Sequence, residues 1–235
     1  MGKKKVAIVT GGSRGIGKAI AIELAKNNYD LAVFGRNIKF LDVTKELIKK
    51  HGAKCLVFSG DVCDDDFVME SVKQVFNIFQ KVDVLVNNAG YGKFDLFVDS
   101  SLEEFKKMMD VNLFGVYRFT KQVVPKMIEQ KNGTIINISS LAGKNPFVRG
   151  TMYASTKHAL MGFSRSLMLE LRKDNIKVAV VCPGSVDTEF FSTAGIEAAS
   201  NNILTPQNVA DSVMAILNLP PNALLSEVDI RPTNP

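Results

Sequence analysis

The chain has 235 residues, of which 46% are hydrophobic and 23% are charged, a balance ordinary for a soluble globular protein with a sizeable core. No apolar run approaches the ~20 residues that a membrane span needs, and the N-terminus lacks the apolar stretch of a secretion signal. The net charge of +5 comes from 29 basic and 24 acidic residues, with the lysines scattered along expected helices. We therefore expect a cytoplasmic protein that binds neither membranes nor nucleic acid, and a polyanionic ligand would explain part of the excess charge.

The cysteines and histidines argue against two kinds of site. Cys55, Cys63 and Cys182 are an odd number without a CxxC spacing, which fits reduced intracellular thiols better than a disulfide framework. His51 and His158 have no carboxylate or thiol around them at the spacing of metal ligands. We therefore expect no metal site, and no hydrolase in which either histidine activates a serine.

Short β-branched runs alternate along the chain with longer amphipathic segments, a pattern typical of a parallel sheet with crossover helices. Most of the runs are apolar throughout, as expected for strands covered on both faces. The predicted strands are residues 6–10, 31–34, 54–58, 84–87, 134–138, 177–181 and 227–230. Predicted helices between them include residues 16–27, 152–173 and 206–217. No linker or repeat interrupts this order, so we predict one doubly wound α/β domain over residues 1–235, with a mostly parallel seven-stranded sheet and helices on both faces.

The first predicted strand ends in a glycine-rich run, residues 10–17, which reads TGGSRGIG and leads directly into a helical pattern. Glycines let the chain turn sharply and let backbone N–H groups approach a pyrophosphate without interference from Cβ atoms. The N–H groups and the positive dipole at the start of the next helix then hold the anion. The alternative is a tight turn without a ligand. The position of the run after the first strand of a βαβ pattern favours a dinucleotide.

The residues after the second predicted strand indicate which dinucleotide is bound. An NAD enzyme has a carboxylate there, about 20 residues beyond the glycines, for the ribose 2′-hydroxyl. This chain has Arg36 instead, and no acid lies between Asp30 and Asp42. Together with Arg14 of the glycine run, Arg36 would clamp a 2′-phosphate between two guanidinium groups. The alternative is that both are ordinary surface arginines. We predict NADP(H) as the cofactor.

Two tyrosine–lysine pairs have the four-residue spacing that places both side chains on one face of a helix. They are Tyr153 with Lys157 and Tyr117 with Lys121. The first pair follows a predicted strand that ends in two serines, and the carboxyl ends of parallel strands are where ligands bind in open α/β sheets. The second pair lies inside an amphipathic stretch with no such strand before it. We therefore predict that the first pair is functional and the second is structural.

The chain resembles the short-chain dehydrogenase/reductase family along nearly its whole length. The pieces that match stand in family order: residues 10–17, Asp61 with Val62, residues 87–90, Asn112, Ser140, Tyr153 with Lys157, and Pro183 with Gly184 followed by Thr188. Among members, it is loosely most similar to bacterial carbonyl reductases of the 3-oxoacyl-(acyl-carrier-protein) reductase type. The resemblance implies a Rossmann fold, a homo-oligomer, and NADP(H)-dependent, reversible reduction of a carbonyl group to an alcohol, with a ketone, aldehyde or 3-oxoacyl substrate.

The resemblance also implies catalytic roles, which physical chemistry makes reasonable. Free tyrosine has a pKa of ~10, and a neighbouring ammonium group favours the phenolate. Tyr153 would be the general acid in reduction and the general base in oxidation, with Lys157 lowering its pKa and bonding the nicotinamide ribose. Ser140 would donate a hydrogen bond to the substrate oxygen. Asn112 would hold a water that feeds protons toward the lysine, unless it only satisfies helix backbone.

Most of the remaining matched residues would contact the cofactor. Asp61 would accept from the adenine amino group, or alternatively cap the next helix. The cofactor-binding residues implied are Gly11, Ser13, Arg14, Gly15, Ile16, Gly17, Arg36, Asp61, Val62, Asn87, Ala89, Gly90, Tyr153, Lys157, Pro183, Gly184, Val186 and Thr188. An apolar, aromatic substrate pocket is expected, formed by Tyr91, Phe94, Phe147 and Phe190 under a lid at residues 188–205.

The end of the chain departs from the family. Many relatives end in a glycine-rich strand that packs across a tetramer axis, whereas residues 226–235 contain no glycine. We therefore expect a homodimer, formed through the apolar helices near residues 113–127 and 152–171, and a tetramer stays possible. The alternative function is a non-catalytic NADP(H)-binding redox sensor or regulator. Such proteins usually lose the tyrosine or lysine, and this chain keeps both.

Overall fold

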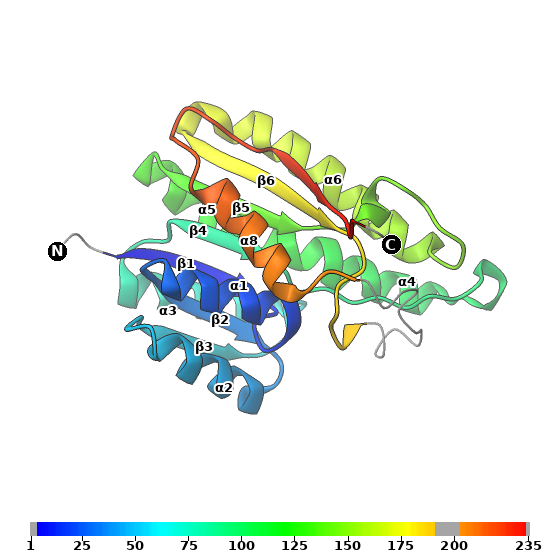
Figure 1. Cartoon of the computed structure of the whole chain (residues 1–235), viewed down its shortest axis with the longest axis horizontal. Helices are drawn as coiled ribbons and strands as arrows, with labels where there is room; N and C mark the ends of the chain where they lie inside the picture. Colours follow the sequence, from blue (N-terminus) through cyan, green and yellow to red (C-terminus); the bar gives the residue numbers. More distant parts are fainter. Residues whose placement is uncertain (1–3, 191–202, 234–235) are drawn as a thin grey trace.

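Seven strands form one sheet that is covered by helices on both faces (Figure 1). The computed structural model describes residues 4–190 and 203–233. The strands are β1 (Lys5–Thr10), β2 (Tyr29–Gly35), β3 (Cys55–Ser59), β4 (Val84–Asn87), β5 (Gly133–Ile138), β6 (Ile176–Pro183) and β7 (Glu227–Ile230). Their order in the sheet is β3-β2-β1-β4-β5-β6-β7, and every neighbouring pair is parallel.

The helices follow the strands as crossover connections. The α-helices are α1 (Gly15–Lys26), α2 (Ile38–Lys49), α3 (Asp65–Phe79), α4 (Leu102–Met109), α5 (Gly115–Gln130), α6 (Thr151–Leu171) and α8 (Pro206–Leu217). Short 3₁₀ turns occupy η1 (Phe97–Asp99), η3 (Leu141–Gly143) and η4 (Arg172–Asp174), and η2 (Asp110–Phe114) is a π-helical turn. Four of the α-helices begin at a side chain that accepts a backbone N–H: Asn37, Asp64, Ser101 and Thr205.

Two apolar clusters lie on opposite faces of the sheet, as the uninterrupted apolar strands predict. One cluster packs α1, α2 and α8 against the sheet, and fully buried Leu24, Leu41 and Val213 belong to it. The other packs α3 and α5, and fully buried Phe34 and Phe119 belong to it with their rings edge to face. The predicted doubly wound fold is confirmed.

The observed boundaries differ from the predicted ones in small ways. The sheet is parallel throughout rather than mostly parallel. Strand β2 starts two residues before the predicted residue 31, and α6 ends at Leu171 because the chain tightens into η4 before an αL residue, Asn175. The helix expected from residue 113 starts instead at Gly115, after the π-helical turn η2. No described helix is long and apolar enough to cross a membrane.

The strand order reverses between β1 and β4, which are neighbours in the sheet although far apart in the chain. In open α/β sheets, this reversal leaves a crevice at the carboxyl ends of the strands, where ligands bind. The segments after β1, β4, β5 and β6 all leave the sheet at this edge, toward which the strand arrows point in Figure 1.

Candidate active site

The glycine run forms a tight cradle between β1 and α1. Gly11 and Gly15 have φ angles of +65° and +53°, which side chains with a Cβ rarely adopt. A Cβ added to Gly11 would lie 2.9 Å from the Cα of Ala89, and one added to Gly17 would collide with the Gly11 carbonyl oxygen. The tight turn therefore requires glycine at these positions, and the N-terminus of α1 faces the same place.

The end of β4 holds this cradle through Asn88. Its side-chain amide donates to the carbonyl oxygens of Thr10 (3.0 Å) and Gly11 (3.2 Å). In return, the Thr10 hydroxyl accepts the backbone N–H groups of Asn88 and Ala89, each at 3.0 Å. The motif at residues 87–90 pointed to this segment, but Asn88 was not among the predicted cofactor-binding residues.

Asn87 was predicted to line the cofactor, and its side chain is directed into the core. It is 2% exposed, and its amide donates to Asn137 Oδ1 (2.9 Å) and Thr120 Oγ1 (3.3 Å) inside the core. Successive residues of an extended segment point to opposite sides, so when Asn87 faces inward Asn88 faces the glycine cradle. Contact between Asn87 and the cofactor stays a prediction, whereas Asn88 is the asparagine whose side chain borders the cradle.

Both predicted phosphate-binding arginines are exposed at the carboxyl edge. Arg14 precedes α1 and Arg36 follows β2. The ends of β1 and β2 lie together there, because a Cβ on Gly35 would be only 3.3 Å from the Ser13 side chain. Among the described residues, neither arginine takes part in an ion pair, so both guanidinium groups are available to an anion.

Asp61 and Val62 follow β3 on the same edge. The Asp61 carboxylate accepts the backbone N–H of Cys63 (3.0 Å), whereas Asp64 caps α3 by accepting the N–H of Phe67 (3.0 Å). The alternative role of Asp61 as the helix cap is therefore excluded. Val62 is 8% exposed and packs close to Gly115 at the start of α5.

Ser140, Tyr153 and Lys157 converge beyond the end of β5. Ser140 caps the turn η3, its hydroxyl accepting the Ala142 N–H at 3.1 Å. The Tyr153 and Lys157 side chains come from the first turns of α6 and are almost fully buried. The Lys157 ammonium donates to the Ile138 carbonyl oxygen at 3.1 Å and lies 5.7 Å from the centre of the Tyr153 ring.

Burial dominates the titration of this pair. It raises the pKa of Tyr153 to about 12, against a smaller lowering by the hydrogen bond with Ser140. It lowers the pKa of Lys157 to about 8. The sequence led us to expect that Lys157 holds the tyrosine pKa below its ordinary value. In the chain alone, the loss of solvation raises the pKa of Tyr153 more than the hydrogen bond with Ser140 lowers it, so the expected lowering is not present.

Asn112 lies in the π-helical turn η2 and connects two parts of the site. Its carbonyl oxygen accepts the Tyr91 N–H (2.8 Å), and its amide donates to the Tyr91 carbonyl oxygen (2.8 Å) and to Thr156 Oγ1 (3.0 Å). The Asn112 side chain therefore does not satisfy backbone groups of its own helix, which was the alternative role. A Cβ on Gly90 would lie 3.6 Å from Asn112 Oδ1 and 3.9 Å from Lys157 Nζ, so both polar groups border the same small space.

The competing pair, Tyr117 and Lys121, lies on the outer face of α5. Tyr117 is 50% exposed, and Lys121 is exposed as well. Both side chains point to the outer face of α5, beside the start of α3, so the structure brings the Tyr153 pair and not this one together with Ser140.

Aromatic rings surround Tyr153 on the expected substrate side. The centres of the Phe94 and Phe190 rings lie 5.2 and 5.8 Å from that of Tyr153, and the Phe147 ring lies 5.5 Å from that of Phe94. The Tyr91 hydroxyl instead donates to Glu104 on α4 at 2.6 Å. Of the predicted lid, residues 191–202 lie outside the described residues.

The segment after β6 borders the cradle from the other side. Gly184 donates its N–H to the Ile230 carbonyl oxygen (2.9 Å), and Val186 forms a short bridge with Leu204. A Cβ on Gly15 would lie 3.1 Å from the Thr188 methyl group. An open cleft of about 690 Å³ runs here between α1 and the start of α8. No cluster of metal-ligating side chains occurs among the described residues.

The chain belongs to the short-chain dehydrogenase/reductase family of oxidoreductases, because the family described as short chain dehydrogenase matches residues 5–198. Carbonyl reductase family member 4 of Xenopus tropicalis is 36% identical to it over 223 residues, 92% of each chain.

Two solved structures extend the likeness to the fold. An alcohol dehydrogenase from the archaeon Thermococcus sibiricus, complexed with 5-hydroxy-NADP, is 33% identical with a TM-score of 0.90 over 97% of each chain. A 3-ketoacyl-(acyl-carrier-protein) reductase from Brucella melitensis, complexed with NADH, is 25% identical with the same TM-score over 97% of each chain. The first therefore holds a derivative of the phosphorylated dinucleotide NADP, and the second holds the unphosphorylated dinucleotide NADH.

Proposed function

We propose that this protein is an NADP(H)-dependent reductase that converts a carbonyl group reversibly to an alcohol. The convergence of Ser140, Tyr153 and Lys157 beside the glycine cradle carries the proposal. Reduction adds a hydride to the carbonyl carbon and a proton to its oxygen, so the site needs a dinucleotide and a proton donor together. Both requirements are met at the same edge of this sheet.

The residues present fit the dinucleotide. The turn at Gly11 and Gly17 excludes a Cβ because one would collide with neighbouring backbone, and a compact glycine turn leading into a helix N-terminus suits a pyrophosphate. Asp61 and Val62 would hold the adenine end, and Pro183 with Gly184 would border the nicotinamide. NADPH, when bound, supplies the hydride; the chain's own residues position it and exclude water.

The preference for the phosphorylated cofactor rests on charge. Arg14 and Arg36 would flank the adenine ribose, and neither is neutralised by a carboxylate among the described residues. A dianionic 2′-phosphate would pair with both guanidinium groups. The two solved relatives bind cofactors of both kinds, so these two arginines, and not the likeness, support the proposal.

Proton transfer would occur at the Tyr153 hydroxyl. Its raised pKa keeps the phenol protonated at neutral pH, the form that donates to a developing alkoxide. Ser140 would donate to the same substrate oxygen and stabilise its charge. Lys157 would bond the ribose and, together with the positive nicotinamide, favour the phenolate that remains. Asn112 would place a water beside the ammonium for proton resupply.

The substrate proposed is a ketone, aldehyde or 3-oxoacyl group attached to an apolar body. The Phe94 and Phe190 rings pack beside the Tyr153 ring, and Phe147 packs beside Phe94, so a polar substituent next to the carbonyl would lose hydration without compensation. Bulky apolar carbonyls are therefore expected to react better than short hydroxylated ones.

The test is NADPH oxidation by the purified protein against a panel of aldehydes, ketones and 3-oxoacyl thioesters. Turnover with at least one carbonyl, and its loss in Tyr153→Phe, supports the proposal. Tight NADPH binding without turnover of any panel member would favour the redox sensor or regulator instead.

We also propose a homodimer, because exposed apolar side chains gather on α5 and α6. They include Tyr117, Ile128 and Leu169, which are 50%, 38% and 59% exposed, and Phe114, immediately before α5, is 48% exposed. In water, such side chains on two long helices favour burial against a second copy.

A further inference from the structure

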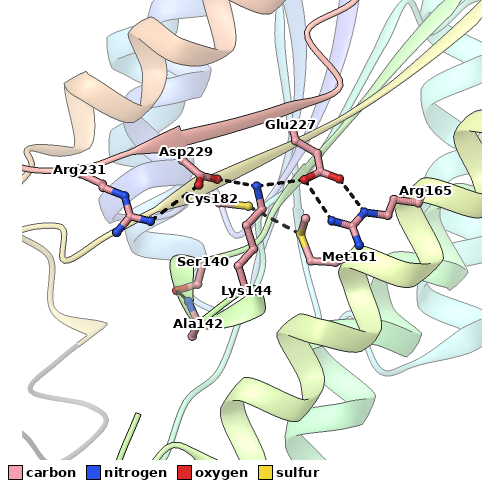
Figure 2. A network of polar contacts seen from close by, with 9 residues as sticks. All are labelled: Ser140, Ala142, Lys144, Met161, Arg165, Cys182, Glu227, Asp229 and Arg231. Carbon is pink, nitrogen blue, oxygen red and sulfur yellow. Dashed lines mark hydrogen bonds and ion pairs between the residues drawn. The ribbon is translucent and has the colours of Figure 1, made fainter. Parts of the chain in front are cut away.

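An ion-pair cluster connects the turn that carries Ser140 to the distant edge strand. Lys144 directly follows η3, and its ammonium lies 2.9 Å from Glu227 Oε2 and 2.7 Å from Asp229 Oδ1 (Figure 2). Both carboxylates stand on β7, whose alternate residues point to the same face of the sheet. The residue next to the catalytic turn is thus fixed to a strand more than 80 positions later.

The same cluster reaches the helix of the proton donor. Arg165 of α6 pairs with Glu227 through two bonds, Nε to Oε1 at 2.6 Å and Nη2 to Oε2 at 3.2 Å. Such a two-point contact fixes orientation as well as distance. Arg165 lies on the same helix as Tyr153 and Lys157, and Figure 2 shows Glu227 between the two cations.

The edge strand also contacts the segment expected beside the nicotinamide. Gly184 donates to the Ile230 carbonyl oxygen, and a Cβ on Gly184 would lie 3.3 Å from the Leu141 side chain. β7 therefore touches all three parts of the site that follow β5: the turn with Ser140, helix α6, and the segment after β6.

The cluster is charged at neutral pH. Pairing with Arg165 lowers the pKa of Glu227 to about 2, and the hydrogen bond with Asp229 raises the pKa of Lys144. The Lys144, Glu227 and Asp229 side chains are 25%, 26% and 35% exposed. Ion pairs of this exposure contribute little to global stability. Their effect is therefore expected in the placement of the short turn that they hold.

We propose that Lys144 is a positioning residue of the active site. Its ion pairs fasten the Ser140 turn to β7, and the pair of Glu227 with Arg165 fastens β7 to helix α6, so the turn is held at a fixed distance from the helix that carries Tyr153. This inference rests on the proposed reductase function. Loss of the ammonium would free the turn, so the Ser140 hydroxyl would spend less time where it meets the substrate oxygen. Ser140 itself would be unchanged.

The first experiment compares Lys144→Met with a matched control, Lys177→Met. Lys177 also fastens the C-terminal segment, since its ammonium donates to the carbonyl oxygens of Pro220 (2.9 Å) and Ala223 (2.7 Å), but it lies at the other end of β6. We expect kcat to fall about tenfold in Lys144→Met, because a small misplacement of a catalytic group costs that much or more. KM for NADPH should change little, Lys144→Arg should restore most of kcat, and Lys177→Met should leave it near that of the wild type. Equal losses in the two methionine variants would overturn the proposal.

A double-mutant comparison tests whether Lys144 acts through Ser140. In a Ser140→Ala background, Lys144→Met should cost little further activity, because the hydroxyl that it positions is already absent. If the two losses in kcat multiplied independently, Lys144 would not act through Ser140 and the proposal would be wrong.

A final measurement needs no turnover. The amides of Ala142, Gly143 and Lys144 donate within the turn, to Ser140 and Leu141. Their hydrogen exchange should become faster in Lys144→Met and stay unchanged in Lys177→Met. If the wild type reduced no carbonyl, the proposed function would fail, while faster exchange would still show that Lys144 holds the turn. Unchanged exchange in Lys144→Met would overturn the proposal in either case.

Discussion

The Tyr153 hydroxyl lies where burial and hydrogen bonding act in opposite directions. Burial raises its pKa to about 12, and the bond with Ser140 offsets part of that rise. The phenol suits proton donation in reduction without further adjustment. Alcohol oxidation requires the phenolate, so the charges of Lys157 and of the oxidised nicotinamide would have to lower the pKa once the cofactor is bound.

Tyr153→Phe removes only the proposed proton donor. We expect it to abolish nearly all turnover while leaving NADPH binding largely intact, because the ring keeps its contacts with Phe94 and Phe190. Tyr117→Phe, the variant of the exposed tyrosine on α5, should keep kcat within a few-fold of the wild type. Steady-state rates and NADPH titrations measure both effects, and similar rates for the two variants would contradict the assignment of the site.

Arg36→Asp tests the preference for the phosphorylated cofactor. The wild type should bind NADPH at least about tenfold more tightly than NADH, a difference of about 1.4 kcal/mol. The new carboxylate would repel the 2′-phosphate and accept from a ribose 2′-hydroxyl, so the preference should shrink or reverse. Fluorescence titration with both cofactors measures it. Equal affinities in the wild type would show that Arg14 and Arg36 are ordinary surface arginines.

The pH dependence of reduction should depend on Lys157. Its buried ammonium has a pKa of about 8, so it loses its charge as the pH rises through that value, while Tyr153 stays protonated. We expect kcat/KM for a carbonyl to be level below about pH 8 and to fall above it. Lys157→Arg keeps a cation at higher pH, so its profile should lose this fall. An identical fall in both proteins would assign it to another group.

At the scale of elements, the carboxylates of Glu227 and Asp229 hold β7 to α6 and to the Ser140 turn. Glu227 has a folded pKa of about 2, below its ordinary value of 4.5. Its ion pairs therefore add stability at pH values above 4.5, and this contribution is lost as the pH falls toward 2.

Glu227→Gln tests this window by thermal unfolding. The variant should melt below the wild type at neutral pH, by no more than a few degrees because the pairs are partly exposed. The difference in Tm should shrink between pH 4.5 and 2 as the wild-type carboxylate gains its proton. A difference that stayed constant over that range would show that the pairing of Glu227 with Arg165 and Lys144 does not lower its pKa.

At the scale of the whole molecule, the exposed apolar side chains of α5 and α6 predict a dimer. Leu169 is 59% exposed on α6, so Leu169→Arg places a charge on the expected interface. The variant should yield a monomer in sedimentation velocity experiments. Leu102→Arg is the matched control, because Leu102 is 67% exposed on a different helix, α4, and should leave the dimer intact. A monomeric wild type would refute the expected dimer, and a tetramer would show that a second surface is used.

Local patterns were sufficient for the fold, and they led to the residues that the structure brings together at the candidate site. Uninterrupted apolar runs indicate strands that are buried on both faces. The glycine run at residues 10–17 indicates a turn that has no room for larger residues. Tyr153 and Lys157 come after a strand that is followed by two serines, and this order indicated the carboxyl edge. These inferences need only neighbours in sequence, because period and spacing are local properties.

The amino-acid sequence by itself therefore determined the doubly wound domain, the family, and the tyrosine that lies at the site rather than on the surface. Tertiary structure decided which asparagine supports the glycine cradle, since an inward Asn87 makes Asn88 face it. It also decided that burial governs the Tyr153 pKa, and that Lys144 is held by carboxylates of β7. Solvation depends on how the strands pack, and so do contacts such as those of Asn88 with Gly11 and of Lys144 with Asp229, which join residues 77 and 85 positions apart. Such contacts produce no periodic pattern in the sequence.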